Sequence, residues 1–141
     1  MLTTPPAVSI QISKVVVAML DERRVKGYVY NFSPIRDVFS VFPSENSPKK
    51  DAVEIKLIGV KAIFFVKTFT GNPAYRDTRA LDAARRGRKI EVAFFDGEKL
   101  TGTTEAYHPQ KPGFFLFVAD PKSNNVRVYV VNANVRSVRF L

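Results

Sequence analysis

The sequence predicts an all-β protein in which two tandem five-stranded barrels are joined by a short basic helix. Residues 17–34 (VAMLDERRVKGYVYNFSP) and 92–109 (VAFFDGEKLTGTTEAYHP) share Val, Ala, Asp, Gly and Pro at the same spacing, which indicates an internal duplication. Within each copy, apolar and polar residues alternate over short segments, as they do in half-buried strands. Turn residues separate these segments, and closing five short strands into a barrel removes exposed sheet edges.

The second copy shows the expected elements in order. Residues 90–94 (IEVAF) alternate in polarity and predict a first strand, which ends in a tight turn at Asp96-Gly97. The second strand holds Gly102 in its interior, where a glycine indicates a sharp bend or a close backbone approach. Three further strands are expected at residues 114–119, 126–131 and 135–140.

The first copy repeats this order, with Gly27 in place of Gly102 and a poorer turn at residues 21–24 (DERR). The copies align from Lys14 and Lys89 over 29 positions, after which a two-residue difference in loop length is expected to shift the register. The predicted parts of the chain are a flexible N-terminal segment (1–13), the first barrel (14–67), a basic helical linker (68–88) and the second barrel (89–141).

The segment between the copies favours a helix. Asn72 is a suitable N-cap, Pro73 suits the first helical position, and Gly87 suits the C-terminal end. Arg85 and Arg86 fall in the last turn, where positive charge complements the helix dipole. We therefore expect the linker to present a basic helix between the two barrels.

Two segments, GEKLTGTTEAYHP and RRVKGYVYNFSP, each place a strand with an internal glycine between a turn and a polar corner. This layout resembles the Sm-like branch of the SH3-type barrels, and the resemblance covers roughly residues 14–66 and 89–141. The tandem form also resembles an uncharacterised bacterial domain that can accompany PilZ cyclic-di-GMP receptors. Sm-like RNA binders often have an acidic residue followed by Asn at the corner of the third strand and a Lys-His pair in the last turn. This sequence has neither, so we assign no uridine-binding residue from the resemblance.

Composition limits the partners and the compartment. The chain has a formal charge of +9, and residues 67–89 hold 7 basic but only 2 acidic residues. A basic chain attracts polyanions such as nucleic acid. The absence of cysteine excludes disulfides, thiolate metal sites and cysteine nucleophiles. The apolar run VVVAML is too short for a signal peptide or a bilayer span, so we expect a cytoplasmic protein without a membrane partner.

Catalytic, metal and cofactor sites are not predicted, so the chain is not expected to be an enzyme. The single histidine, His108, has Ser33 as its counterpart in the first copy, so this position does not require an imidazole. The carboxylates cluster at turns, and their spacing does not resemble a metal site. PilZ receptors use an RxxxR run and a D/N-x-S-x-x-G motif. Here NFSPIR (31–36) ends in Arg and no two arginines stand four apart, which argues against cyclic-di-GMP.

The sequence predicts a non-enzymatic interaction or regulatory module that binds another protein or itself. By alternation, Phe64 and Ile58 point out of the first barrel, and an exposed apolar patch marks a contact surface. On the shifted alignment, their counterparts are Arg139 and Val131. We expect the two copies to pack against each other through this face and to leave part of it for a partner.

The alternative is a sequence-tolerant RNA or DNA binder. Basic residues in and after the linker would follow the phosphates, and aromatic residues at strand ends would stack on bases. The candidate contacts are Arg76, Arg79, Arg85, Arg86, Arg88, Lys89, Tyr28, Tyr30, Phe32 and Tyr107.

Overall fold

The structure, a computed structural model, describes residues 10–71, 87–118 and 122–141. These residues form ten strands and three short 3-10 turns but no α-helix, which confirms the all-β prediction. The strands are β1 (Ile12–Met19), β2 (Arg24–Tyr30), β3 (Val38–Val41), β4 (Val53–Lys56), β5 (Val60–Val66), β6 (Arg88–Phe94), β7 (Lys99–Thr104), β8 (Gly113–Val118), β9 (Asn125–Val131) and β10 (Val135–Phe140). The turns are η1 (Lys49–Asp51), η2 (Leu57–Gly59) and η3 (Asn132–Asn134). The predicted linker helix falls mainly on residues 72–86, which lie outside the described residues.

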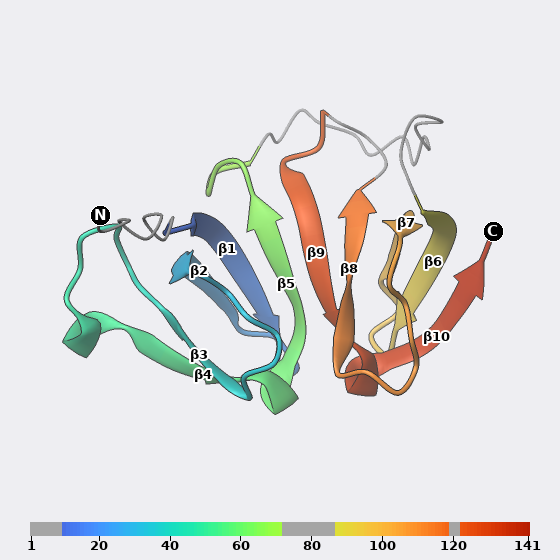
Figure 1. Cartoon of the computed structure of the whole chain (residues 1–141), viewed down its shortest axis with the longest axis horizontal. Helices are drawn as coiled ribbons and strands as arrows, with labels where there is room; N and C mark the ends of the chain where they lie inside the picture. Colours follow the sequence, from blue (N-terminus) through green and yellow to red (C-terminus); the bar gives the residue numbers. More distant parts are fainter. Residues whose placement is uncertain (1–9, 72–86, 119–121) are drawn as a thin grey trace, which may run out of the picture.

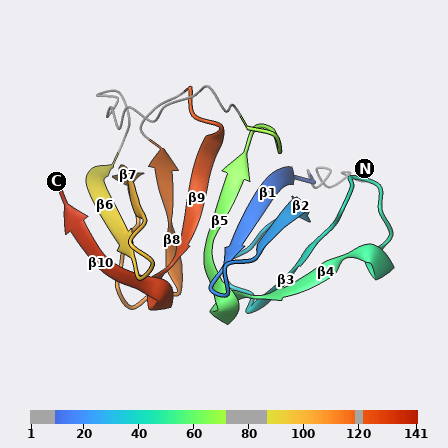
Figure 2. The same cartoon turned by 180° about the vertical axis from the view of Figure 1, so that it is seen from behind.

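Eight strands form one antiparallel sheet in the order β10-β6-β7-β8-β9-β5-β1-β2, and β3 pairs with β4 beside it. A bridge between Tyr28 and Phe42 connects β2 with β3. Figures 1 and 2 show β5 next to β9 at the centre, β3 and β4 at one end and β10 at the other. The expectation of two closed barrels is wrong for the described strands, because β5 and β9 pair with each other and join the halves into one continuous sheet.

The pairing register repeats along the chain at a constant offset. In β3 and β4, Phe39 pairs with Ile55, and 75 residues later Phe114 of β8 pairs with Val130 of β9. The β1–β5 and β6–β10 pairs carry a β-bulge at the same place, and η2 and η3 follow β4 and β9 in the same way. The structure therefore supports the internal duplication that the sequence predicts.

The constant offset corrects the alignment of the last strands. The expected two-residue shift is wrong, because the paired strands keep the offset of 75 on both sides of the loop after Phe42. Ile58 of η2 consequently corresponds to Ala133 of η3 rather than to Val131. The match of Phe64 with Arg139 is unaffected.

The two cores share their central strands. Ile63 and Phe65 of β5 pack into the core of the first half, which Tyr129 of β9 also enters. Phe64, which lies between them in β5, packs into the core of the second half with Phe114. All of β5 is buried as a result, and the halves interlock through alternating side chains of paired strands.

Gly27 and Gly102 lie where the sequence predicts a close backbone approach. A Cβ atom on Gly27 would collide with the carbonyl oxygen of Phe42, and one on Gly102 would collide with that of Phe117. This prediction is confirmed, and glycine is required at both positions because the neighbouring backbone leaves no room for a side chain.

Candidate protein-interaction edge

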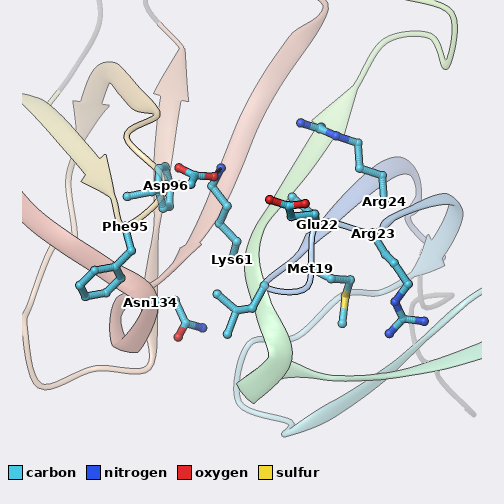
Figure 3. Close-up of a pocket in the computed structure, with 11 residues that line it drawn as sticks. Met19, Glu22, Arg23, Arg24, Lys61, Phe95, Asp96 and Asn134 are labelled. Atoms are coloured by element: carbon cyan, nitrogen blue, oxygen red, sulfur yellow. Dashed lines mark hydrogen bonds and ion pairs between the residues drawn. The ribbon is translucent and has the colours of Figure 1, made fainter.

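The joint between the halves contains a buried lysine that a β-bulge turns toward the neighbouring half. In the β1–β5 pair, Ala18 lies opposite Ala62 and Met19 opposite Val60, so Lys61 is the extra residue of the bulge. A bulge bends the strand locally and re-aims the side chain of the extra residue. Figure 3 shows Lys61 extending from β5 toward Asp96, which lies in the turn between β6 and β7 of the other half.

Lys61 binds two carboxylates of that turn. Its Nζ atom lies 2.6 Å from Asp96 Oδ2, 2.6 Å from Glu98 Oε1 and 4.8 Å from the centre of the Phe94 ring. The lysine side chain is 10% exposed, whereas the side chains of Asp96 and Glu98 are 54% and 40% exposed. The buried ammonium group of Lys61 therefore binds the β6–β7 turn of the second half to strand β5 of the first half.

The charges of this cluster are mutually stabilised. Burial by itself lowers the pKa of Lys61, but its hydrogen bonds with Asp96 and Glu98 outweigh this effect and leave the pKa raised. The hydrogen bond from Lys61 lowers the pKa of Asp96, and the backbone N–H of Glu98 acts in the same direction. The lysine stays protonated and the aspartate stays ionised near neutral pH.

A cavity of about 390 Å³ opens beside this cluster, between the β1–β2 turn and the β6–β7 turn. Its lining includes Lys61 and Asn134, whose side-chain amide donates to the Val60 carbonyl oxygen at 2.7 Å. Leu20 and Phe95, which occupy equivalent positions of the two turns, are 50% and 69% exposed. Figure 3 shows Glu22 on the opposite side of β5 from Asp96.

The two turns have the same hydrogen bonds but different residues at the left-handed position. The Arg23 N–H donates to Asp21 Oδ1, just as the Glu98 N–H donates to Asp96 Oδ1. At the left-handed position, the second half has Gly97 with φ +92° and the first half has Glu22 with φ +73°. The poorer turn predicted at residues 21–24 is confirmed as strained backbone, because a non-glycine residue pays a steric penalty there.

At the far end of the sheet, β10 repeats β5 but has an open edge. Among the described strands, β10 pairs only with β6. The Leu141 N–H donates to the Lys89 carbonyl oxygen, and in an antiparallel ladder the backbone groups of alternate residues point the same way. The N–H and C=O groups of Val138 and Phe140 therefore point away from β6 and can accept another strand.

This open edge is cationic. Arg136 is the extra residue of the β10 bulge, since Val135 lies opposite Phe94 and Ser137 opposite Ala93. Arg136 is exposed, and it forms no ion pair or hydrogen bond with any described side chain. Arg139 is also exposed, and its guanidinium lies 3.2 Å from Glu91. Arg136 thus occupies the position of Lys61 without the carboxylates that Lys61 binds.

The two apolar residues predicted as a protein interface have different environments. Phe64 is 7% exposed and packs into the second core, so it lies in the contact between the two copies and leaves almost no surface for a partner. Alternation correctly turns Phe64 out of the first core, but the second half covers it. Ile58 lies in η2 and is 80% exposed.

The six predicted nucleic-acid contacts in the described part of the chain are divided between the two halves. Arg76, Arg79, Arg85 and Arg86 lie outside the described residues. The Arg88 guanidinium lies 3.7 Å from the centre of the Phe140 ring, and Tyr107 contacts the same ring, while Lys89 is exposed nearby on β6.

The other three aromatic candidates belong to the first half and are half-buried. Tyr28 packs edge-on against Phe69, and the Tyr30 hydroxyl donates to the Glu45 carbonyl oxygen. Phe32 lies within the aromatic cluster of the first core. These rings hold the β2–β3 region together, so their main role is structural packing.

Sequence reasoning missed Lys61 and Arg136, although one signal was present. Both are basic and occupy equivalent positions of the duplicated last strand, whereas most surface charges differ between the copies. The bulge that re-aims them depends on the pairing register and has no signature in the sequence of either strand.

In the described residues, no group of three or more His, Asp or Glu side chains is arranged to hold a metal ion. His108 Nδ1 accepts a hydrogen bond from the Gln110 N–H and serves its own loop. No helix in the described part of the chain has the length and apolar character needed to cross a bilayer.

One protein family matches nearly all of the chain. A family of unknown function, DUF6982, matches residues 11–141. The chain belongs to the DUF6982 family. The match includes both halves and the strand β10, so the open edge lies within the DUF6982 region. No curated protein and no solved structure matches the chain.

Proposed function

We propose that this protein is a non-enzymatic interaction module that binds another protein by adding a strand to the open edge of β10. The observation that carries the proposal is the pairing of β5 with β9, because β5 is the first copy of β10. In the first half, the outward backbone groups of β5 pair with β9. In the second half, the equivalent groups of β10 are unpaired among the described residues. Open sheet edges of this kind recognise extended peptides through main-chain hydrogen bonds.

The strand order of each half supports the predicted ancestry. In both halves the fifth strand lies beside the first, followed by the second, third and fourth. We extend the proposal to an Sm-like origin of both halves. In this view each ancestral barrel has opened, so that β9, the fourth strand of the second half, pairs with β5, the fifth strand of the first half. The strand order is compatible with this origin. Each half then has two outer strand edges, of which one (β5 or β9) is used in the joint and the other is unpaired among the described strands.

A proline at Val138 tests the proposed function. It removes an N–H that points away from β6, so the β6–β10 ladder and the melting temperature should change little. Lysine-directed cross-linking in an extract of the cells that make the protein should join Lys89 of the wild-type chain to a partner. Val138→Pro should abolish this cross-link, whereas the control Ile58→Ser should retain it. Loss of the cross-link in Ile58→Ser but not in Val138→Pro would move the interface to η2 and refute the proposal.

A second candidate function is binding of single-stranded nucleic acid. Arg88, Phe140 and Tyr107 support it, because a cation and two partly exposed rings lie together beside the basic segment that precedes β6. In this case the logarithm of the affinity for random single strands should fall steeply with the logarithm of the salt concentration. Replacing Arg85, Arg86 and Arg88 with Gln should flatten that slope. An absence of binding at low salt excludes this candidate.

A further inference from the structure

We infer that the partner of β10 is an acidic chain, which pairs one strand with β10 and places carboxylates against Arg136. The inference rests on the proposed function and adds the chemistry of the partner. Its template is the joint inside the molecule, where a strand pairs with β5 while two carboxylates reach the bulge lysine. The chain thus displays the arrangement by which one strand edge of this fold recognises a neighbour.

Arg136 retains the geometry and the charge of Lys61. Both residues are the extra residue of a bulge in the fifth strand of their half, at the same offset as the rest of the duplication. A guanidinium can bind a carboxylate through two parallel hydrogen bonds, so Arg136 is at least as suited to an acidic partner as lysine. Arg139 and Lys89 add further positive charge along this edge.

A second copy of the chain does not fit this edge. Transferring the β5–β9 register would place β4 of the second copy beside β10, with its Lys56 directly opposite Arg136. Like charges directly opposite each other destabilise a strand pair. The residue that corresponds to Glu98 is Arg23, which already binds Asp21 at 2.6 Å. The open edges therefore repel each other, and the occupant must be a different, acidic chain.

The same template defines the rest of the strand. Tyr129 of β9 lies opposite Ile63 of β5, so the partner should place an apolar residue opposite Val138. Val138 is half-buried and Phe140 is 40% exposed, which leaves apolar surface for such a contact. In the template the strand is β9 and the carboxylates come from the separate β6–β7 turn, so a peptide that joins an alternating strand to an Asp-Gly-Glu end is a probe that carries both parts. Nucleic acid does not meet these requirements, because it cannot continue the backbone hydrogen bonds of the sheet.

Three labelled peptides test the inference by fluorescence anisotropy. They share one alternating Val/Thr strand and end in Asp-Gly-Glu, in Asn-Gly-Gln or in Lys-Gly-Lys. The wild-type protein should bind the acidic peptide at least about tenfold more tightly than the amide peptide, because a charge-assisted hydrogen bond contributes more than a neutral one. Arg136→Gln should remove this preference, and Arg136→Glu should transfer it to the lysine peptide.

The controls separate the chemistry of the partner from strand addition itself. Arg24→Gln, an exposed arginine of the other half, should leave all affinities unchanged, whereas Val138→Pro should weaken binding of every peptide. Equal binding of the acidic and amide peptides would overturn the inference but leave strand addition standing. Dimerisation of the wild-type chain that Arg136→Gln abolishes would make a second copy the occupant and overturn it as well. If neither peptide binding nor the Lys89 cross-link depends on Val138, the proposed function itself fails.

Discussion

The inner strand β5 and the edge strand β10 are copies of one element that now have opposite surroundings. Phe64 of β5 is buried against the second half, and the equivalent Arg139 of β10 is exposed and pairs with Glu91. Ala62 likewise corresponds to the exposed Ser137. The difference shows that the duplicated strand kept its backbone pairing and that these two side chains differ according to what covers them.

The bulge residue, by contrast, keeps its positive charge in both places. Charged residues on an edge strand normally prevent uncontrolled pairing, and Arg139 is sufficient for that role. Arg136 instead preserves the cation that Lys61 uses to hold two carboxylates. Under the proposed function, Arg139 therefore limits pairing with unwanted neighbours, whereas Arg136 favours an acidic one.

The largest effect on stability is expected when Phe64 of β5 is replaced by arginine, the residue at the equivalent position 139 of β10. Phe64→Arg would bury an unpaired charge and remove a core ring, which should lower the free energy of unfolding by at least about 3 kcal/mol in urea titration. The reverse exchange, Arg139→Phe, should change that free energy by less than about 0.5 kcal/mol, because the site is exposed. It should promote self-association, measurable by sedimentation, because it adds an exposed ring to an open edge. Similar losses of stability in both variants would show that the joint and the edge do not differ.

A smaller effect is expected at the buried cation. Lys61→Met keeps the length of the side chain but removes its two hydrogen bonds with half-exposed carboxylates, so the expected loss is about 1–2 kcal/mol. Arg136→Met should have almost no effect on stability, because Arg136 has no such partners among the described residues. An equal loss in both variants would contradict the assigned roles.

The Lys61→Met variant should also change how stability depends on pH. The pKa of Asp96 is lowered in the folded protein, so its contribution is present above the unfolded value of 3.8 and disappears as the pH falls through the lower folded value. The pKa of Lys61 is raised, so its contribution is present below 10.5 and disappears as the pH rises through the higher folded value. Urea titrations across the pH range should show the largest difference between wild type and Lys61→Met from about pH 5 to 9.

The smallest effect is expected at the two turns. Glu22→Gly should stabilise the protein by up to about 1 kcal/mol, because glycine relieves the left-handed strain but gains freedom in the unfolded chain. Gly97→Ala should destabilise it by about 1 kcal/mol for the same steric reason. If Glu22→Gly lowers the melting temperature, the glutamate side chain must make a stabilising contact that outweighs its backbone strain.

Most strands and the duplication were predictable from the sequence, because alternation, glycines and turn residues are local signals. The structure contains the expected strands near residues 90–94 and 135–140, and Gly102 makes the expected close approach. The register of the last strands was predicted wrongly, since short apolar runs such as VEIKLI and VRVYVV align almost equally well at two offsets. The pairing of Phe39 with Ile55 distinguishes these offsets, and that is a tertiary contact.

The candidate site was less predictable than the fold. Alternation showed that Phe64 leaves its own core, but no local pattern shows which strand covers it. The site residues Lys61 and Arg136 depend on a bulge and on a neighbouring turn, both of which are set by strand pairing. The open edge is likewise a property of the strand order and could be recognised only when β5 and β9 proved to be partners.

The alternation of Ile63, Phe64 and Phe65 between two cores has a consequence for how the chain folds. Neither repeat can complete its interior alone, since each depends on side chains from a strand that the other repeat supplies. Thermal melting should therefore be a single cooperative transition, and a fragment ending within the linker should remain largely unfolded. Each repeat is therefore one half of a single folding unit.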